Sequence, residues 1–396
     1  MNPSKEHLVG NKSVPSAYVP GYSHARTVDP EAADNYVLHG FIGDPELDPV
    51  MEEVSLLRPD ELHRFITAGM TKNNAVLNKA PESLRRFFAD LEAPPPWLDH
   101  DAFRPGVATF HSQVDRMLAA FVAGVLVEGF STLIAKSFRM TGRVQSTGKR
   151  LMQNNRHVTE IFYPGGLLRE NDGWKTSVRI RFVHARVRNL LSKYDEWDHA
   201  AWGVPLSAAN MGLAISVFSK RLIEYSKILG SRFSAEEEES ILAIWRYTGY
   251  LMGIPESILY TDAESAERIY RIGFLIEPPA DKDSATMANA LINSVPEITK
   301  IKDPKERKST IELAYRLSRA IIGNELANRY EYPKMSTFLV IPFFRMKQYL
   351  KQRLGKMDNT VRMNNFSQLV LVSLFEHKGI EYNLPDHVKH DKSSPW

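Results

Sequence analysis

The residues whose types and spacing could do chemistry centre on His184, which stands among apolar residues and arginines. At helical spacing, the face of His184 carries three apolar side chains, those of Ile180, Val187 and Leu191. Arg181 and Arg188 lie about one turn to either side. An apolar wall beside an imidazole can meet a porphyrin ring, and guanidinium groups can bind its carboxylates. The pattern fits a haem ligand, but it also fits a core histidine beside a solvated arginine stripe, which is the commoner arrangement.

The chain contains no cysteine. This absence excludes thiolate-ligated haem, iron–sulfur clusters, cysteine-based zinc sites and disulfide bonds. A bound haem would therefore take histidine as its protein ligand, or less commonly tyrosine or methionine.

Short marks surround His184 in a fixed order along the chain. They are Thr141-Gly142-Arg143, Arg150, Pro164-Gly165-Gly166, Gly173-Trp174, His184-Ala185-Arg186-Val187-Arg188, Trp202-Gly203-Val204-Pro205, Phe218-Ser219, and the run from Trp245 to Glu256. In this order they resemble the latex clearing protein (rubber oxygenase) family, which shares its catalytic domain with the mycophenolate-pathway oxygenase MpaB. The resemblance covers residues 95–275 and rests on the joint order, because no single mark is specific.

The resemblance implies an all-α fold, a globin-like multi-helix bundle around a pocket for haem b, with His184 as the proximal iron ligand. Its family members use dioxygen to cut C=C bonds of polyisoprenoid chains. An oxidoreductase is therefore implied, a haem-dependent and dioxygenase-like oxygenase acting on a small apolar, isoprenoid-like substrate, with any redox partner unknown. The alternatives are a related-fold haem protein with peroxidase, peroxygenase or oxidase chemistry, or a non-catalytic haem-binding helical protein.

The family also carries an arginine, followed three and four positions later by lysine and threonine, on the helix before the histidine. Arg150 fits this arginine, but the next two positions hold Gln153 and Asn154, and we assign all three to the distal, catalytic side. Arg150 could also bind a propionate, and it equally fits a surface arginine on an amphipathic helix. Met140 stands where rubber oxygenases have an acid. Because glutamine and methionine replace neither a sixth iron ligand nor a base, the haem is a firmer expectation than rubber cleavage.

His157 lies seven positions after Arg150 and hence on the same helix face. It could offer a second imidazole on the distal side, and a six-coordinate iron would suit electron transfer better than dioxygen binding. Most other histidines, among them His7, His24, His387 and His390, are expected to be solvated.

Apolar periodicity predicts helices over most of the chain beyond Pro94-Pro95-Pro96. The expected ranges are 100–137, 145–162, 174–193, 207–228, 235–252, 262–276, 284–294, 304–328, 342–355 and 360–378. Ser234 and Glu237 form a capping-box pattern before one of them. Prolines interrupt residues 1–50, which are expected to form an irregular arm.

Composition sets the outer limits. The 396 residues, 43% of them hydrophobic, can bury a large core, and we expect an arm (1–50), a single all-α oxygenase-like domain (51–385) and a tail (386–396). A net charge of +3 gives no electrostatic case for nucleic acid. The most apolar run, 117–135, is interrupted by Glu128, so it predicts a core helix and no transmembrane segment. The first residues lack the apolar run of a secretory signal, and a cytoplasmic protein is expected.

Overall fold

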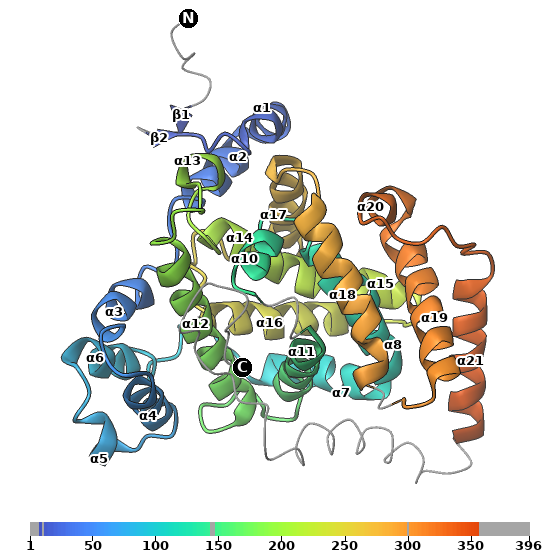
Figure 1. Cartoon of the computed structure of the whole chain (residues 1–396). Coiled ribbons are helices and arrows are strands. Elements are labelled where there is room, and N and C mark those ends of the chain that lie inside the picture. Colours follow the sequence, from blue (N-terminus) through green and yellow to red (C-terminus); the bar gives the residue numbers. More distant parts are fainter. Residues whose placement is uncertain (1–7, 10–11, 143–146, 299–300, 356–396) are drawn as a thin grey trace, which may run out of the picture.

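The computed structural model describes residues 8–9, 12–142, 147–298 and 301–355. Across them the chain is helical apart from one antiparallel hairpin, formed by β1 (Leu8–Val9) and β2 (Lys12–Ser13) (Figure 1). The predicted all-α class is confirmed.

The N-terminal region is helical, which corrects the irregular arm predicted for residues 1–50. It forms α1 (Val19–Val28), α2 (Pro30–His39) and α3 (Leu47–Val54). Pro20 and Pro30 stand in the first turns of α1 and α2, where the missing backbone N–H costs no intrahelical hydrogen bond. Asp29 caps α2 by accepting a hydrogen bond of 3.0 Å from the Ala32 amide. The prolines here begin helices instead of breaking them.

Three further helices precede the polyproline segment. They are α4 (Pro59–Met70), α5 (Asn74–Leu77) and α6 (Glu82–Asp90). Phe87 and Phe88 of α6 place their rings 5.4 Å and 5.7 Å from the ring of Phe182. This aromatic contact joins the N-terminal helices to the helix that carries His184.

The apolar region predicted as one helix over 100–137 is instead broken into short segments. They are a 3₁₀ turn (Asp101–Phe103), α7 (Arg104–Ser112), α8 (Val114–Ala120), a π-helical turn η3 (Phe121–Val125), α9 (Leu126–Gly129) and α10 (Ile134–Met140). The predicted burial is confirmed, because Met117, Phe121 and Val125 are at most 1% exposed.

Glu128, the charge inside this apolar run, is satisfied within the core. Its carboxylate accepts hydrogen bonds from Arg221 Nε (2.9 Å), Tyr225 Oη (2.9 Å) and Tyr270 Oη (3.0 Å). Within the described ranges, no single helix is long and apolar enough to cross a bilayer. The segment Val114–Gly129 passes such a test only together with α10, and the two are bent by 87°.

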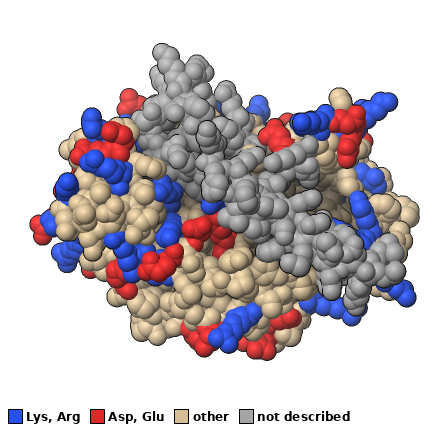
Figure 2. All heavy atoms as spheres, turned by 90° about the horizontal axis from the view of Figure 1, so that it is seen from below, with Lys and Arg blue, Asp and Glu red and all other residues tan. Residues whose placement is uncertain are grey.

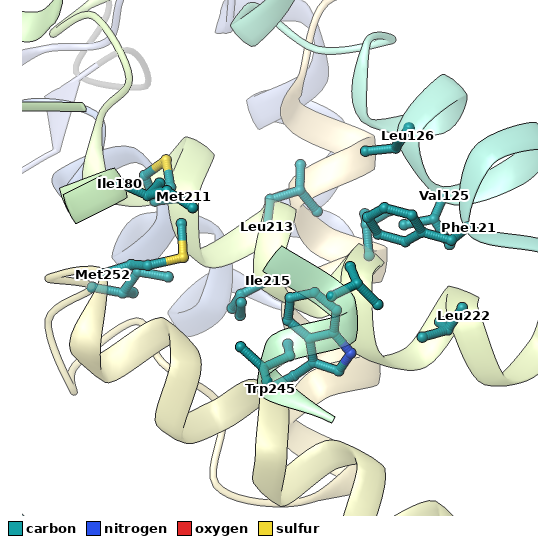
Figure 3. Packing of buried hydrophobic residues seen from close by; sticks show 14 of the residues in the cluster. Phe121, Val125, Leu126, Ile180, Met211, Leu213, Ile215, Leu222, Trp245 and Met252 are labelled. Carbon is teal, nitrogen blue, oxygen red and sulfur yellow. The ribbon is translucent and has the colours of Figure 1, made fainter. Parts of the chain in front are cut away.

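The central helices follow the predicted ranges closely. They are α11 (Thr147–Ile161), α12 (Asp172–Leu191), α13 (His199–Trp202), α14 (Ala208–Ser216), a π-helical turn η4 (Val217–Arg221), α15 (Leu222–Ile228) and α16 (Ala235–Leu251). The capping box of Ser234 and Glu237 is confirmed at the start of α16. Trp245 of α16 lies in the core near Phe121 (Figure 3). The ring centroids of Phe121 and Phe218 are 6.5 Å and 5.4 Å from that of Trp245.

The C-terminal helices cover one side of this core (Figure 1). They are α17 (Ala263–Ile276), α18 (Lys282–Ile298), α19 (Pro304–Ile322), α20 (Asn324–Arg329) and α21 (Val340–Gly355). The helix predicted over 304–328 is split at Gly323, whose φ of +87° ends α19. The helix predicted over 360–378 and the tail 386–396 lie outside the described residues.

Acidic and basic side chains are intermingled over the described part of the face that Figure 2 presents. This distribution agrees with the nearly balanced net charge of +3.

Candidate functional site

Two glycine marks shape the turn that leads from α11 into α12. A Cβ atom added at Gly173 would lie 2.7 Å from the carbonyl oxygen of Gly166 and 2.8 Å from that of Glu160. The Trp174 amide donates a hydrogen bond of 3.1 Å to the Gly166 carbonyl. Glycine is therefore required here because two backbone segments approach more closely than a side chain would allow.

Buried polar contacts join α11 to α12 just beyond this turn. His157 Nε2 lies 2.9 Å from Ser177 Oγ, and the Ser177 hydroxyl donates to the Gly173 carbonyl at 2.7 Å, so His157 acts as the donor. Burial lowers the pKa of His157 to about 3, which keeps its imidazole neutral. Glu160 accepts from Arg156 Nε at 2.6 Å and from Thr176 Oγ1 at 2.8 Å. His157 thus joins two helices in this structure, whereas the sequence had suggested a second distal imidazole.

His184 lies partly buried on α12, between two apolar clusters. Ile180, one turn earlier, belongs to the main core, where Figure 3 shows it on the same side as Met211 and Met252. The second cluster contains the other two apolar neighbours predicted for His184, together with Met140; its buried members are Ile134, Met140, Val187, Leu191, Trp197 and Leu206. The apolar surroundings expected of His184 are therefore present on its helix.

Met140 is 7% exposed and packs in this second cluster. The position at which rubber oxygenases carry an acid is thus an apolar packing position in this chain. A carboxylate placed there would be surrounded mainly by hydrocarbon.

The Arg181 guanidinium binds carboxylates of the N-terminal region. The side chain is 2% exposed, and the guanidinium donates to Asp44 (Nε–Oδ2 2.5 Å, Nη2–Oδ1 2.8 Å) and to Glu46 (Nη2–Oε2 2.7 Å). Burial would lower the pKa of Arg181, but the carboxylates of Asp44 and Glu46 raise it above its usual value.

Arg188, two helical turns after Arg181, also binds an acidic residue of the N-terminal region. Its guanidinium contacts Asp48 at 2.8 and 2.9 Å and donates to the Leu206 carbonyl at 2.9 Å. In this structure both guanidinium groups bind the chain itself, and the cofactor-binding role of these arginines stays a prediction. The signal that could have revealed this pairing is the alternating acidic series Asp44, Glu46 and Asp48.

The residues predicted for the distal side lie on α11. Gln153 is buried at 8% exposure and Asn154 is partly buried, while the side chain of Arg150 lies outside the described part of the chain. Gln153 is one helical turn before His157 and so faces the same general direction.

The contact between His157 and Ser177 is a reference point from which the positions of Arg150 on α11 and His184 on α12 can be measured. Arg150 lies seven residues before His157, and His184 lies seven residues after Ser177. At 1.5 Å per residue, each position is about 10 Å along its own helix from this contact. Both positions thus lie about the same length of helix from this contact, on two helices that pack against one another.

A cavity of 180 Å³ lies elsewhere among the described residues, and none of the predicted site residues lines it. Its lining includes Ser131, Lys136, Trp202, Pro279 and Asp281. No group of three or more His, Cys, Asp or Glu side chains suited to a metal ion occurs within the described ranges.

Comparison with known proteins assigns the fold and the family. Residues 108–345 match the catalytic domain of the ER-bound oxygenase mpaB/B′ and rubber oxygenase. A rubber oxygenase of Streptomyces sp. (strain K30) is 24% identical over 261 residues, which span 62% of this chain and 58% of that relative. The structure of latex clearing protein in the closed state superposes with a TM-score of 0.64 at 18% identity, covering 85% of this chain and 91% of the other. The chain therefore belongs to the mpaB/rubber oxygenase catalytic-domain family.

Proposed function

We propose that this protein is a haem b-dependent oxygenase that uses dioxygen to oxygenate or cleave C=C bonds of an apolar, isoprenoid-like substrate, with His184 as the proximal iron ligand. Membership of an oxygenase family supports the reaction class. The observation that carries the assignment of residues is the place of His184 on α12, where it is partly buried and its predicted apolar neighbours pack in two clusters. The proposal includes a globin-like placement of α11 and α12 on the two sides of the haem.

The chemistry of the described side chains fits a haem at its iron ligand. His184 is a partly buried imidazole between two apolar clusters, which suits a porphyrin edge and a neutral nitrogen ligand. The fit is poorer at the propionates, because Arg181 and Arg188 bind carboxylates of the chain itself. Arg150 is the remaining assigned cation, and it would hold a propionate or act on the distal side.

When bound, haem would supply the iron at which dioxygen is activated. The chain's own distal groups are the amides of Gln153 and Asn154, which can donate and accept hydrogen bonds but do not exchange a proton near neutral pH. Met140 and its neighbours contribute an apolar wall that excludes water. These residues orient a substrate and leave any proton transfer to another group.

A second candidate is a haem protein of the same fold with peroxidase, peroxygenase or oxidase chemistry. Met140, packed among hydrocarbon side chains, favours this candidate because the reaction of rubber oxygenases would lack the acid at that position. Its substrate could still be apolar.

Reconstitution with haem b followed by absorption spectroscopy tests the cofactor. A Soret band that shifts when the reduced protein meets carbon monoxide is expected, and a protein that binds no haem would contradict the proposal. Incubation of the loaded protein with an isoprenoid alkene and ¹⁸O₂ then separates the two candidates. Labelled aldehyde or ketone ends support the oxygenase, whereas turnover only with hydrogen peroxide supports the second candidate.

A further inference from the structure

The outer face of α21 exposes a continuous apolar surface. The helix packs beside α19 at the edge of the molecule (Figure 1), with Val340 buried and Phe344 partly buried toward the core. On the opposite side lie exposed apolar side chains, which we call the α21 stripe: Leu339 (57% exposed), Phe343 (55%), Met346 (52%), Tyr349 (56%) and Leu350 (47%). Phe343, Met346 and Leu350 follow the spacing i, i+3, i+7, which places them in one row along the helix, and Leu339 stands just before its first turn.

The turn before α21 holds further apolar side chains outward. Phe338 is 77% exposed, and Leu339 has a φ of +59°, a conformation that L-residues other than glycine rarely adopt. Arg316 of α19 supports this turn by donating to the Ser336 carbonyl at 2.8 Å and to the Phe338 carbonyl at 3.5 Å. A hydrogen-bonded turn thus holds Phe338 and Leu339 outward. Exposure of two large apolar side chains to water is unfavourable unless another surface covers them.

Every charged residue of α21 is basic. These residues are Arg345, Lys347, Lys351 and Arg353, and the helix contains no aspartate or glutamate. By helical phase, Lys347 lies beyond one edge of the α21 stripe and Arg345 beyond the other, while Arg353 falls within it. Lys351 pairs with Asp115 at 2.8 Å, so its charge is compensated within the chain, and the Arg345 guanidinium donates to the Ile228 carbonyl at 2.9 Å. An apolar row flanked by long cationic side chains is typical of a helix that lies in the plane of a membrane surface, since the cations reach the headgroups while the apolar side chains enter the acyl region.

Three partners could cover the α21 stripe: a second copy of the chain, the segment 356–396, or a membrane surface. Their charges distinguish them. A second copy of the chain would bring another basic α21 against the first. The segment 356–396 carries five Lys or Arg and five Asp or Glu residues, so it offers no net negative charge to the helix. An anionic lipid surface complements both the apolar row and its basic edges.

We propose that α21 docks the protein on anionic membranes, with the α21 stripe and Phe338 inserted at the headgroup boundary. The proposal does not depend on the haem or on the reaction.

The absence of cysteine permits a direct test on the full chain. Met346→Cys carries an environment-sensitive fluorophore, and Leu56→Cys, in the turn between α3 and α4 and 88% exposed, is the matched control. With vesicles of phosphatidylcholine and phosphatidylserine, we expect a blue shift and quenching by brominated acyl chains at position 346 alone. Vesicles of phosphatidylcholine alone should give a much smaller response. No response at position 346 would overturn the proposal.

Vesicle co-sedimentation measures the contribution of the basic residues. Lys347→Gln should weaken binding to anionic vesicles about fivefold, because each cation near the surface contributes a comparable factor. The control Lys79→Gln, at an exposed position beside α5, should bind as the wild type does. Phe343→Ser should reduce binding further while the far-ultraviolet circular dichroism is unchanged.

Two further outcomes would also overturn the proposal. If the probe at position 346 is already shielded without vesicles in a concentration-dependent way, the α21 stripe is covered by a second copy. If it is shielded at every concentration, another part of the same chain covers it.

Discussion

At the scale of single residues, the two histidines of the α11–α12 pair differ in their surroundings. His157 is buried and hydrogen-bonded to Ser177, whereas His184 is partly buried beside two apolar clusters. The first is suited to holding helices together as a neutral imidazole. The second carries an imidazole of the kind that ligates iron in the proposed haem.

The titration of His157 predicts a loss of stability in acid. Its pKa is about 3 in the folded protein and about 6.5 in the unfolded chain, so below pH 6.5 the unfolded state takes up a proton that the folded state refuses. Stability due to this group is present above pH 6.5 and falls as pH decreases toward 3. Between pH 7 and pH 5, the wild type should lose about 2 kcal/mol more than His157→Gln in urea unfolding. Equal losses in the two proteins would show that His157 does not carry this dependence.

The apolar neighbours of His184 could be predicted from the sequence, but the partners of the nearby Arg181 and Arg188 could not. Helical spacing is a local property, so Ile180, Val187 and Leu191 could be assigned to one face from the sequence. The pairing of Arg181 with Asp44 joins residues 137 positions apart, and spacing carries no information about such a contact. Family resemblance could not reveal it either, because Asp44 lies before the matched region.

At the scale of elements, α12 is anchored by the buried contact of Arg181 with Asp44 and Glu46. Both Arg181 and Asp44 are 2% exposed, so removing one partner leaves the other charge buried and uncompensated.

Arg181→Met should therefore lower the free energy of unfolding by about 3 to 5 kcal/mol. The double variant Arg181→Met/Asp44→Asn should recover part of that loss, since the buried carboxylate is also neutralised. The exposed pair of Arg58 and Asp60 provides the control, and Arg58→Met should cost less than about 1 kcal/mol. Denaturant titration of the four proteins measures these differences, and a similar cost for Arg181→Met and Arg58→Met would refute the anchoring role.

Gly253 and Gly323 form a second matched pair for this anchor. Both have positive φ, of +80° and +87°, but a Cβ at Gly253 would collide with Asp44 and Arg181, whereas at Gly323 it would meet nothing within 4 Å. Gly323→Ala should cost about 1 to 3 kcal/mol from backbone strain alone, since φ +87° with ψ 162° is a conformation that glycine alone readily adopts. Gly253→Ala should cost about 3 kcal/mol or more because it also separates the ion pair. Thermal unfolding compares them, and equal costs would mean that the collision is relieved without loss.

Helix boundaries show how far local rules reach. The ends of α16 and α17 follow their caps, and these were predictable from Ser234 and from the periodicity. The breaks within 100–137 were not, since apolar residues continue through the bends and burial all round removes the periodic signal. Prolines of the N-terminal region misled the prediction because proline is also favoured in a first turn.

At the scale of the whole molecule, the family match begins at residue 108, and α1 to α6 precede it. Of these helices, α3, α4 and α6 meet the family domain at α12, near Arg181 and Phe182, whereas α1 and α2 pack on α17. The helix that carries the proposed iron ligand thus also binds part of the N-terminal region. Haem binding and the stability of the N-terminal region should be coupled.

Haem should therefore raise the unfolding temperature of the full chain. A ligand present at 100 times its dissociation constant stabilises the folded state by about 2.7 kcal/mol. Differential scanning calorimetry with and without haem b should show this shift as a change in the main transition. A haem-dependent shift that is equally large in His184→Ala would place the cofactor elsewhere.

Ligation of haem iron by His184 is tested by the absorption spectrum of His184→Gly with and without added imidazole. The control is His63→Gly, which removes a partly buried histidine of α4. If His184 is the iron ligand, His184→Gly loses the wild-type Soret band, free imidazole restores it by entering the space left by the side chain, and His63→Gly keeps it. A wild-type spectrum in His184→Gly without imidazole would show that another residue holds the iron.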